Sequence, residues 1–295
     1  MLDPEGLARE SVPGRGKPLV RLVARGPGHS TYRVMRDGQF YAMRLPLSPS
    51  APITADTLAS WDVRVFGAAA AAQLGPAICH ADPASGILVT KWVRGRTWTA
   101  ASAKNSAQTT RIALLVRRIQ ALDVLPPRRA MRPDGWIRHY CAILSGAEFP
   151  ASVGRSDWPG RAERHLAVLA ALPSYADVLC HSDLHRFNLV DGAAGLTILD
   201  WEYAHYSDPY WDLAGWLSAN DLSEPDHRLL LEAYLGRAPC SQHLQRLRML
   251  VWLFDYVCLL WSETHADLQV DAAAARAPEF LPRACPRQPE NSPPQ

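Results

Sequence analysis

Three polar side chains near the middle of the chain have the types and the spacing that acid–base or metal chemistry requires. In His181-x-Asp183-x-x-x-x-Asn188 a carboxylate comes five residues before an amide, and a second carboxylate, Asp200, directly follows Thr197-Ile198-Leu199. The apolar residues around them predict short strands, so these polar groups stand on loops at strand ends. A rigid scaffold can aim side chains placed in this way at a substrate.

A zinc site is an alternative interpretation of the same loop. His181, Asp183 and His185 occupy positions i, i+2 and i+4, and three such ligands on an extended chain can bind zinc. This alternative gives no role to Asn188 or to the Asp200-Trp201-Glu202 run, so it explains less of the sequence.

The elements that must hold these loops form a β-rich front part and an α-rich back part. Asp37-Gly38 predicts a tight hairpin, because a type I′ turn needs positive φ at both central positions. Gly75-Pro76 predicts the end of an Ala-rich helix. Strands are predicted at 18–23, 31–36, 39–45, 77–80 and 87–93, and helices at 61–74, 112–122 and 161–172.

The composition argues against several classes of protein. The chain of 295 residues carries 31 basic and 29 acidic side chains, and a net charge of +2 does not suit a nucleic-acid binder with a broad basic face. The most apolar run, 251–261, has 11 residues and includes Asp255, whereas a membrane-spanning helix needs about 20. The first ten residues lack the apolar centre of a signal peptide, and the six cysteines form no CxxC pair. We therefore expect a cytoplasmic protein that binds neither nucleic acid nor membrane.

Three stretches together carry a resemblance to a known superfamily. They are His181-Ser182-Asp183-Leu184-His185-x-x-Asn188, Leu199-Asp200-Trp201-Glu202-Tyr203-Ala204 and Asp208-Pro209-x-x-Asp212-Leu213-Ala214. In this order they resemble the aminoglycoside phosphotransferase and choline/ethanolamine/thiamine kinase superfamily, over about residues 18–265.

The resemblance implies an α+β fold, the bilobal protein-kinase-like fold, with a small antiparallel β-rich N-lobe and a larger α-helical C-lobe. The N-lobe would span 18–95 and bind the nucleotide, and the C-lobe would span 96–277 and hold the catalytic loop and the acceptor site. Residues 1–17, rich in Gly, Pro and charge, predict a flexible lead-in. The Pro-rich residues 278–295 predict a disordered tail.

The same resemblance implies a role for each polar residue of the motif. Asp183 would orient and deprotonate the acceptor hydroxyl, and Asn188 with Asp200 would hold Mg²⁺ between the phosphates of ATP, the co-substrate. Mg²⁺ prefers oxygen ligands, which an amide and a carboxylate supply. His181 would brace the loop by hydrogen bonding, and Asp212 would tether it.

The resemblance also implies nucleotide contacts in the N-lobe, but the motif there is less specific than the one in the C-lobe. The loop with Gly26, Gly28 and Ser30 would cover the phosphates, although His29 stands where the superfamily often has Asn. An ordinary hairpin turn explains the same glycines equally well.

Two charged residues and a short segment complete the implied nucleotide site. Arg44 occupies the place of the phosphate-pairing basic residue on the third strand, and Asp62 that of its acidic partner on the next helix. A solvated strand residue and a charge that complements the helix dipole are the alternatives. Lys91, Trp92 and Val93 lie in a segment that resembles the hinge that meets adenine, and we expect the Lys91 side chain to be solvated.

The acceptor would lie beside the catalytic loop. Candidate substrate residues are His185, Glu202, Asp208, Trp252, Tyr256 and Trp261. Carboxylates beyond those that catalysis needs would attract a cation, and aromatic faces beside carboxylates suit a quaternary ammonium or thiazolium group. Core packing is the alternative for each aromatic residue, because Trp252 and Tyr256 recur at helical spacing.

The sequence therefore predicts an ATP-dependent phosphotransferase that acts on the hydroxyl of a small cationic metabolite, with choline, ethanolamine or thiamine as first candidates. An aminoglycoside phosphotransferase and a non-catalytic kinase-like module that binds nucleotide are the alternatives. The choice between ATP and GTP and the oligomeric state stay open.

Overall fold

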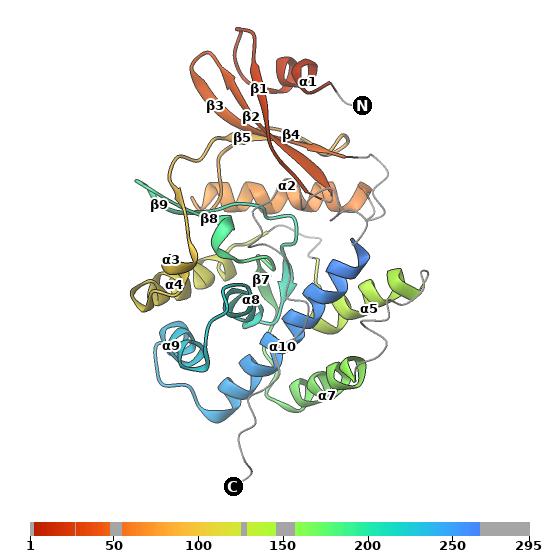
Figure 1. Cartoon of the computed structure of the whole chain (residues 1–295), viewed down its shortest axis with the longest axis vertical. Coiled ribbons are helices and arrows are strands. Elements are labelled where there is room, and N and C mark those ends of the chain that lie inside the picture. Colours follow the sequence, from red (N-terminus) through yellow and green to blue (C-terminus); the bar gives the residue numbers. More distant parts are fainter. Residues whose placement is uncertain (1–2, 27, 48–54, 125–128, 146–156, 266–295) are drawn as a thin grey trace.

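A sheet-containing lobe lies above a larger helical lobe in the computed structural model of the chain (Figure 1). The structure describes residues 3–26, 28–47, 55–124, 129–145 and 157–265. This arrangement confirms the predicted α+β bilobal fold. The Pro-rich stretch 278–295 lies outside the described residues.

The upper lobe contains an antiparallel five-stranded sheet in the order β1-β2-β3-β5-β4. Its strands are β1 (Leu19–Arg25), β2 (His29–Arg36), β3 (Gln39–Pro46), β4 (Ile78–Asp82) and β5 (Ile87–Lys91). The β2–β3 turn has φ of 49° at Asp37 and 74° at Gly38, as the predicted hairpin requires. Helix α2 (Ala55–Ala71) runs below the sheet, between it and the lower lobe (Figure 1).

The first helix corrects the expectation of a flexible lead-in over 1–17. Residues 4–11 form α1 (Pro4–Ser11), with Asp3 as its N-cap and with Ala8 fully buried in the core of the upper lobe. Arg36 donates to the carbonyls of the last turn, and Asp37 accepts the backbone amides of residues 15 and 16. The order of this segment therefore depends on the β2–β3 hairpin, which lies more than 20 residues further along the chain.

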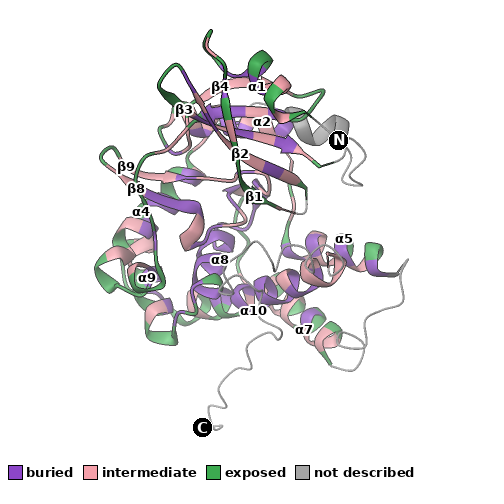
Figure 2. Cartoon of the chain, turned by 45° about the horizontal axis from the view of Figure 1, so that its top comes forward, coloured by how far each residue is buried: buried purple, intermediate pink, exposed green. Residues whose placement is uncertain are grey.

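The lower lobe is built around α10, which packs against α5, α7 and α8. Its helices are α3 (Ala100–Ala103), α4 (Thr109–Gln120), α5 (Pro133–Ser145), α7 (Trp158–Ala171), α8 (Trp211–Ala219), α9 (Glu224–Leu235) and α10 (Ser241–Thr264), with a 3₁₀ turn at Ser106–Gln108. In this lobe the buried residues include most of α8 and the middle of α10, where residues 250–257 are all buried (Figure 2). Within the described residues, none of the helices combines the length and the hydropathy that a membrane span requires.

Two small sheets position the motif loops between the lobes. Strand β7 (Val178–Cys180) pairs with β10 (His205–Ser207), and β6 (Arg96–Thr97) pairs with the hairpin of β8 (Leu189–Gly192) and β9 (Gly195–Ile198). The loop 181–188, which ends in a 3₁₀ turn at Arg186–Asn188, therefore connects two different sheets. Asp200 follows the last strand of the hairpin, as the sequence predicts.

Candidate active site

The catalytic loop, defined here as residues 181–188, is braced by His181. Its buried imidazole has Nε2 2.9 Å from the carbonyl oxygen of Leu199, and its Nδ1 accepts the amide of Asp183 at 3.3 Å. Because Nδ1 accepts, Nε2 carries the proton and donates to Leu199. Both ring nitrogens are therefore used, which argues against the alternative of a zinc triad in this loop.

Asp212 tethers the catalytic loop from the first turn of α8. Its two carboxylate oxygens accept the backbone amides of His181 and Ser182, each at 2.8 Å, and its side chain is buried. Ser182 has φ of 64°, a region that costs energy for a residue with a Cβ. Two hydrogen bonds to a charged acceptor offset that cost. The geometry is the one that the predicted tether requires.

The side chain of Asp183 is partly exposed at the surface of the loop and is held in place by Asn188. The amide nitrogen of Asn188 donates to the carbonyl oxygen and to Oδ2 of Asp183, both at 3.0 Å. About a third of the Asp183 side chain is exposed (34%), so its carboxylate can be reached by a small molecule.

His185 was expected to contact the substrate, but it lies inside the loop. Its Nε2 is 3.4 Å from Asp183 Oδ2 and 3.2 Å from Asn188 Nδ2, and the residue is buried. These contacts correct the expectation, because the ring packs against the two motif residues rather than facing outward.

Asp200 and Glu202 flank a tryptophan that is fully buried. Trp201 donates from Nε1 to the carbonyl oxygen of Ile198 at 3.0 Å and packs edge-on against His181. Asp200 has φ of 60°, a conformation that Asp tolerates better than most residues. The buried indole anchors this segment and leaves the carboxylates on either side of it partly exposed.

Arg44 of β3 joins both of these carboxylates to the upper lobe. Its Nη1 donates to Asp200 Oδ1 at 3.2 Å, and its Nη2 donates to Glu202 Oε2. Burial raises the pKa of Asp200, but Arg44 and the nearby imidazoles outweigh it, so the pKa lies below its usual value. Glu202, expected to contact the acceptor, instead contacts Arg44 of the upper lobe.

The predicted ion pair between Arg44 and Asp62 is absent among the described contacts. Oδ1 of Asp62 is buried without a hydrogen-bond partner, although both side chains line one cavity of about 60 Å³. Burial raises the pKa of Asp62 from 3.8 to about 7, against the opposing charges of Arg44 and Arg129. Arg44, which was expected to pair with Asp62 of α2, instead pairs with Asp200 and Glu202 of the lower lobe.

Some backbone amides and carbonyls of the predicted glycine loop and hinge form hydrogen bonds with other backbone groups of the upper lobe. The amide of Gly26 donates to the carbonyl of His29 at 2.8 Å, and the carbonyl of Gly28 accepts the amide of Leu47 at 3.0 Å. Ser30 is buried within β2.

In the hinge, the amides of Lys91 and Trp92 donate to Ala77 and Phe40 at 2.8 and 3.0 Å. The Lys91 side chain is exposed, as expected.

An aromatic cluster, defined as Trp136, Tyr140, Tyr203 and Trp261, lies within the electrostatic range of Asp183. Trp136 stacks on Tyr140 with centroids 5.9 Å apart and packs against Tyr203 at 6.2 Å, and Trp261 Nε1 donates to the Tyr203 hydroxyl at 2.9 Å. Burial raises the pKa of Tyr140 and of Tyr203, and the charge of Asp183 adds to both shifts. Of the predicted substrate aromatics, the structure thus brings Trp261 to this cluster.

Asp208, by contrast, is part of the protein interior. It forms an ion pair with Arg246 at 3.1 Å, and the side chains of both residues are less than a tenth exposed, at 8% and 6%. Its Oδ1 also accepts the amide of Tyr210 at 2.9 Å. An acid that is buried and paired in this way cannot attract a substrate, which corrects the expectation.

Trp252 and Tyr256 are also core residues. Their rings stack with centroids 5.5 Å apart, and His165 and Arg161 of α7 cover Trp252. Both are buried, so helical spacing here reflects the packing of α10 against α7 and corrects the expected substrate contacts.

Comparison with protein families finds a match over residues 20–250 to a family described as "Phosphotransferase enzyme family". The chain belongs to this phosphotransferase family. The matched range includes every motif residue of the catalytic loop, Asp200 and Arg44.

Among curated proteins, the phosphotransferase is 39% identical over 77 residues to a thiamine kinase of Escherichia coli, an alignment covering 25% of this chain and 27% of that one. It is 31% identical over 91 residues to a LicA homologue of Metamycoplasma hominis, covering 31% and 35%. The aligned parts thus span about a third or less of these relatives.

Among solved structures, choline kinase LicA from Streptococcus pneumoniae matches with a TM-score of 0.72 at 18% identity, covering 90% of this phosphotransferase and 91% of that chain. At this identity the match shows a common fold.

Sequence reasoning missed Trp136 and Tyr140, and it noted His29 only as a departure from the superfamily. Trp136 and Tyr140 are four residues apart, a spacing that places them on one face of α5. That signal was available, but nothing local indicates that this face of the helix lies near Asp183 of the phosphotransferase.

Proposed function

We propose that this phosphotransferase is a kinase that transfers the γ-phosphoryl group of ATP to the hydroxyl of a small cationic alcohol. The observation that carries the proposal is the partly exposed carboxylate of Asp183, which is fixed by Asn188. The aromatic cluster, which the charge of this carboxylate reaches, supports a cationic acceptor. We also propose a cytoplasmic location, which the free state of the five described cysteines supports.

The chemistry assigned to the chain's own residues begins at Asp183. Its carboxylate accepts the proton of the acceptor hydroxyl as the hydroxyl oxygen bonds to the γ-phosphorus, and the β–γ bridging oxygen leaves with ADP. Asn188 holds the carboxylate in place, and the braced backbone of the loop limits its movement. Arg44 binds the phosphates of the nucleotide, because its guanidinium can meet two oxygens at once.

Mg²⁺ fits the donors that the site offers. Asn188 uses its amide nitrogen toward Asp183, which leaves its amide oxygen as a donor, and Asp200 offers a carboxylate of lowered pKa. Both are the hard oxygen donors that Mg²⁺ prefers. When bound, the ion would neutralise phosphate charge. Asn188 and Asp200 are the residues that would hold it.

A cationic acceptor suits the surroundings of Asp183. Electron-rich ring faces attract a quaternary ammonium or an aromatic cation by about 0.5–2 kcal/mol each. Tyr203 and Trp261 are the partly exposed members of the aromatic cluster, so they are the ones that we assign to contact with the acceptor. Choline, ethanolamine and thiamine have the required charge and a primary hydroxyl.

Acceptor-dependent release of ADP from Mg-ATP tests the proposal. The panel is choline, ethanolamine, thiamine and kanamycin, with Asp183→Asn as the blank and Trp261→Leu as the probe of the aromatic cluster. We expect one small cation to be turned over, no turnover in Asp183→Asn, and a KM for the acceptor raised about 3–30-fold in Trp261→Leu with an unchanged KM for ATP.

The possible results separate the alternatives. Turnover of kanamycin alone would favour an aminoglycoside phosphotransferase. Nucleotide binding without turnover of any acceptor would contradict the proposal and favour a non-catalytic binding module.

A further inference from the structure

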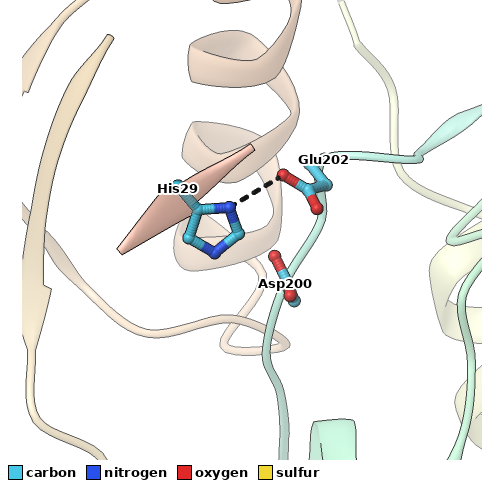
Figure 3. A group of neighbouring side chains, drawn as sticks. All are labelled: His29, Asp200 and Glu202. Atoms are coloured by element: carbon cyan, nitrogen blue, oxygen red, sulfur yellow. Dashed lines mark ion pairs between the residues drawn. The ribbon is translucent and has the colours of Figure 1, made fainter. Parts of the chain in front are cut away.

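A histidine of the predicted glycine loop lies directly against Asp200, the acid that we propose for Mg²⁺. His29, the first residue of β2, faces Asp200 and Glu202, and one potential ligand atom from each of the three residues lies within 4.8 Å of the others (Figure 3). The imidazole Nδ1 is 3.4 Å from Glu202 Oε2, and 15% of the His29 side chain is exposed. His29 is therefore one of the side chains nearest to the carboxylates of Asp200 and Glu202.

Both halves of this cluster are held by the backbone. The carbonyl of His29 accepts the amide of Gly26 at 2.8 Å, and His29 is paired with Pro46 in the β2–β3 register. On the other side, buried Trp201 anchors the segment that carries the two acids. Donors fixed in this way lose little conformational freedom when they bind an ion.

Arg44 contacts one oxygen of each of the two carboxylates. It bonds to Oδ1 of Asp200 and to Oε2 of Glu202, and in the described part of the chain Asp200 Oδ2 and Glu202 Oε1 have no hydrogen-bond partner. Two carboxylates and one guanidinium carry a formal charge of −1, which attracts a cation. A divalent ion would change that sum to +1.

We propose that His29 supplies a nitrogen ligand, beside the carboxylates of Asp200 and Glu202, to a divalent first-row transition-metal ion. Ligands on opposite sides of one such ion are about 4.3 Å apart, so donors now within 4.8 Å need small side-chain adjustments. Imidazole nitrogen adds little for Mg²⁺, which prefers oxygen, but strengthens binding of transition-metal ions. The site therefore prefers Mn²⁺, Co²⁺ or Zn²⁺ over Mg²⁺.

Binding of Mn²⁺ to the full chain without nucleotide or acceptor tests this site. Electron paramagnetic resonance measures free Mn²⁺ during titration, and its pulsed form detects coupling of the bound ion to a histidine nitrogen. We expect nitrogen coupling in the wild-type protein, its loss in His29→Ala and in His29→Asn, and about tenfold weaker binding in both variants. Glu202→Gln should weaken binding to a similar extent, and His80→Ala, which alters a histidine of β4, should bind as the wild type does.

Competition with Mg²⁺ gives the second readout. An excess of Mg²⁺ of about tenfold or more should be needed to displace Mn²⁺ from the wild-type protein, and a smaller excess from His29→Ala. Nitrogen coupling that persists in His29→Ala, or equal Mn²⁺ affinity in all these proteins, would overturn the proposal. The inference rests on the proposed function only for the role of Asp200. Because no phosphoryl transfer is measured, its failure would leave the kinase proposal standing, and the reverse also holds.

Discussion

The catalytic loop and the proposed nucleotide side of the site, around Arg44, show how differently two regions depend on the sequence. In the loop, the carboxylate of Asp183 accepts a hydrogen bond from Asn188, five residues away, and the amide of Asp183 donates to His181, two residues away. On the nucleotide side, Arg44 meets Glu202 across 158 positions. These partners of Asp183 are set by local backbone geometry, although Asp212 tethers the loop from about 30 residues away. The partners of Arg44 are set by competition among acids from different elements.

This difference explains which site expectations needed correction. Asp62, Glu202 and Asp208 were all expected to act through their charge, but each depends on whether an arginine from elsewhere reaches it. Arg44 meets Glu202, Arg246 meets Asp208, and Asp62 has a buried oxygen without a partner. A carboxylate's role thus follows from its partner more than from its place in a motif.

The largest expected effect tests the locally determined region. Asp183→Asn keeps the size of the side chain and removes the base, so we expect turnover to fall by about 10³-fold or more. The midpoint of thermal unfolding should change by no more than about 2 °C, because the side chain is partly exposed and contributes little to the core. ADP release and circular dichroism measure the two quantities. Turnover within tenfold of wild type would show that the geometry of the loop does not identify the base.

Much of the fold could be predicted because its signals are local. The Asp37-Gly38 turn, the strands around it and the amphipathic face of α4 follow from backbone conformation and side-chain periodicity. Helix α1 could not be predicted with the same means, since Arg36 and Asp37 hold its end from a distant hairpin. In the site, the hydrogen bonds of His181 agree with the predicted role, whereas the position of Trp136 against Tyr203 depends on how α5 packs in the folded lobe.

The buried pair of Asp208 and Arg246 gives the next largest effect. Arg246→Met leaves a carboxylate buried without its partner, so we expect the free energy of unfolding to fall by about 3–5 kcal/mol, as measured by urea denaturation. The matched control is Asp191→Asn, which breaks the more exposed pair with Arg111 and should cost less than about 1 kcal/mol. In Asp208→Asn the KM for the acceptor should not change. A raised acceptor KM with unchanged stability would return Asp208 to the substrate site.

A comparison of two acids tests which of them positions Arg44. Glu202→Gln removes the charge that Arg44 contacts, so the KM for ATP should rise about tenfold, the equivalent of one hydrogen bond between charged groups. Asp62→Asn should raise it less than about threefold, because Asp62 makes no ion pair with Arg44 among the described contacts. Initial rates at saturating acceptor give both values. The reverse order would mean that Arg44 turns to α2 when nucleotide binds.

The smallest effect concerns the pH dependence of stability at Asp62. Its pKa in the folded protein is about 7 and its ordinary value is 3.8, so the folded state favours the protonated acid. The stability that this preference contributes is fully present below about pH 4 and is lost as the pH rises through 7. Asp62→Asn stays neutral at every pH. Relative to wild type, the variant should therefore gain about 1–2 kcal/mol of unfolding free energy between pH 5 and pH 8, or a few degrees in Tm.

The control for Asp62 is an acid whose pKa moves in the opposite direction. The side-chain hydrogen bonds from Arg111 lower the pKa of Asp191, so its contribution is already complete above the ordinary pKa of an Asp. The stability difference between Asp191→Asn and wild type should thus stay constant from pH 5 to pH 8. If Asp62→Asn gave the same flat difference, its carboxylate would be ionised throughout this range. An arginine would then have to pair with Asp62 in solution. The structure would in that case not have identified the partner of this acid, and the comparison of the two regions would not hold for Asp62.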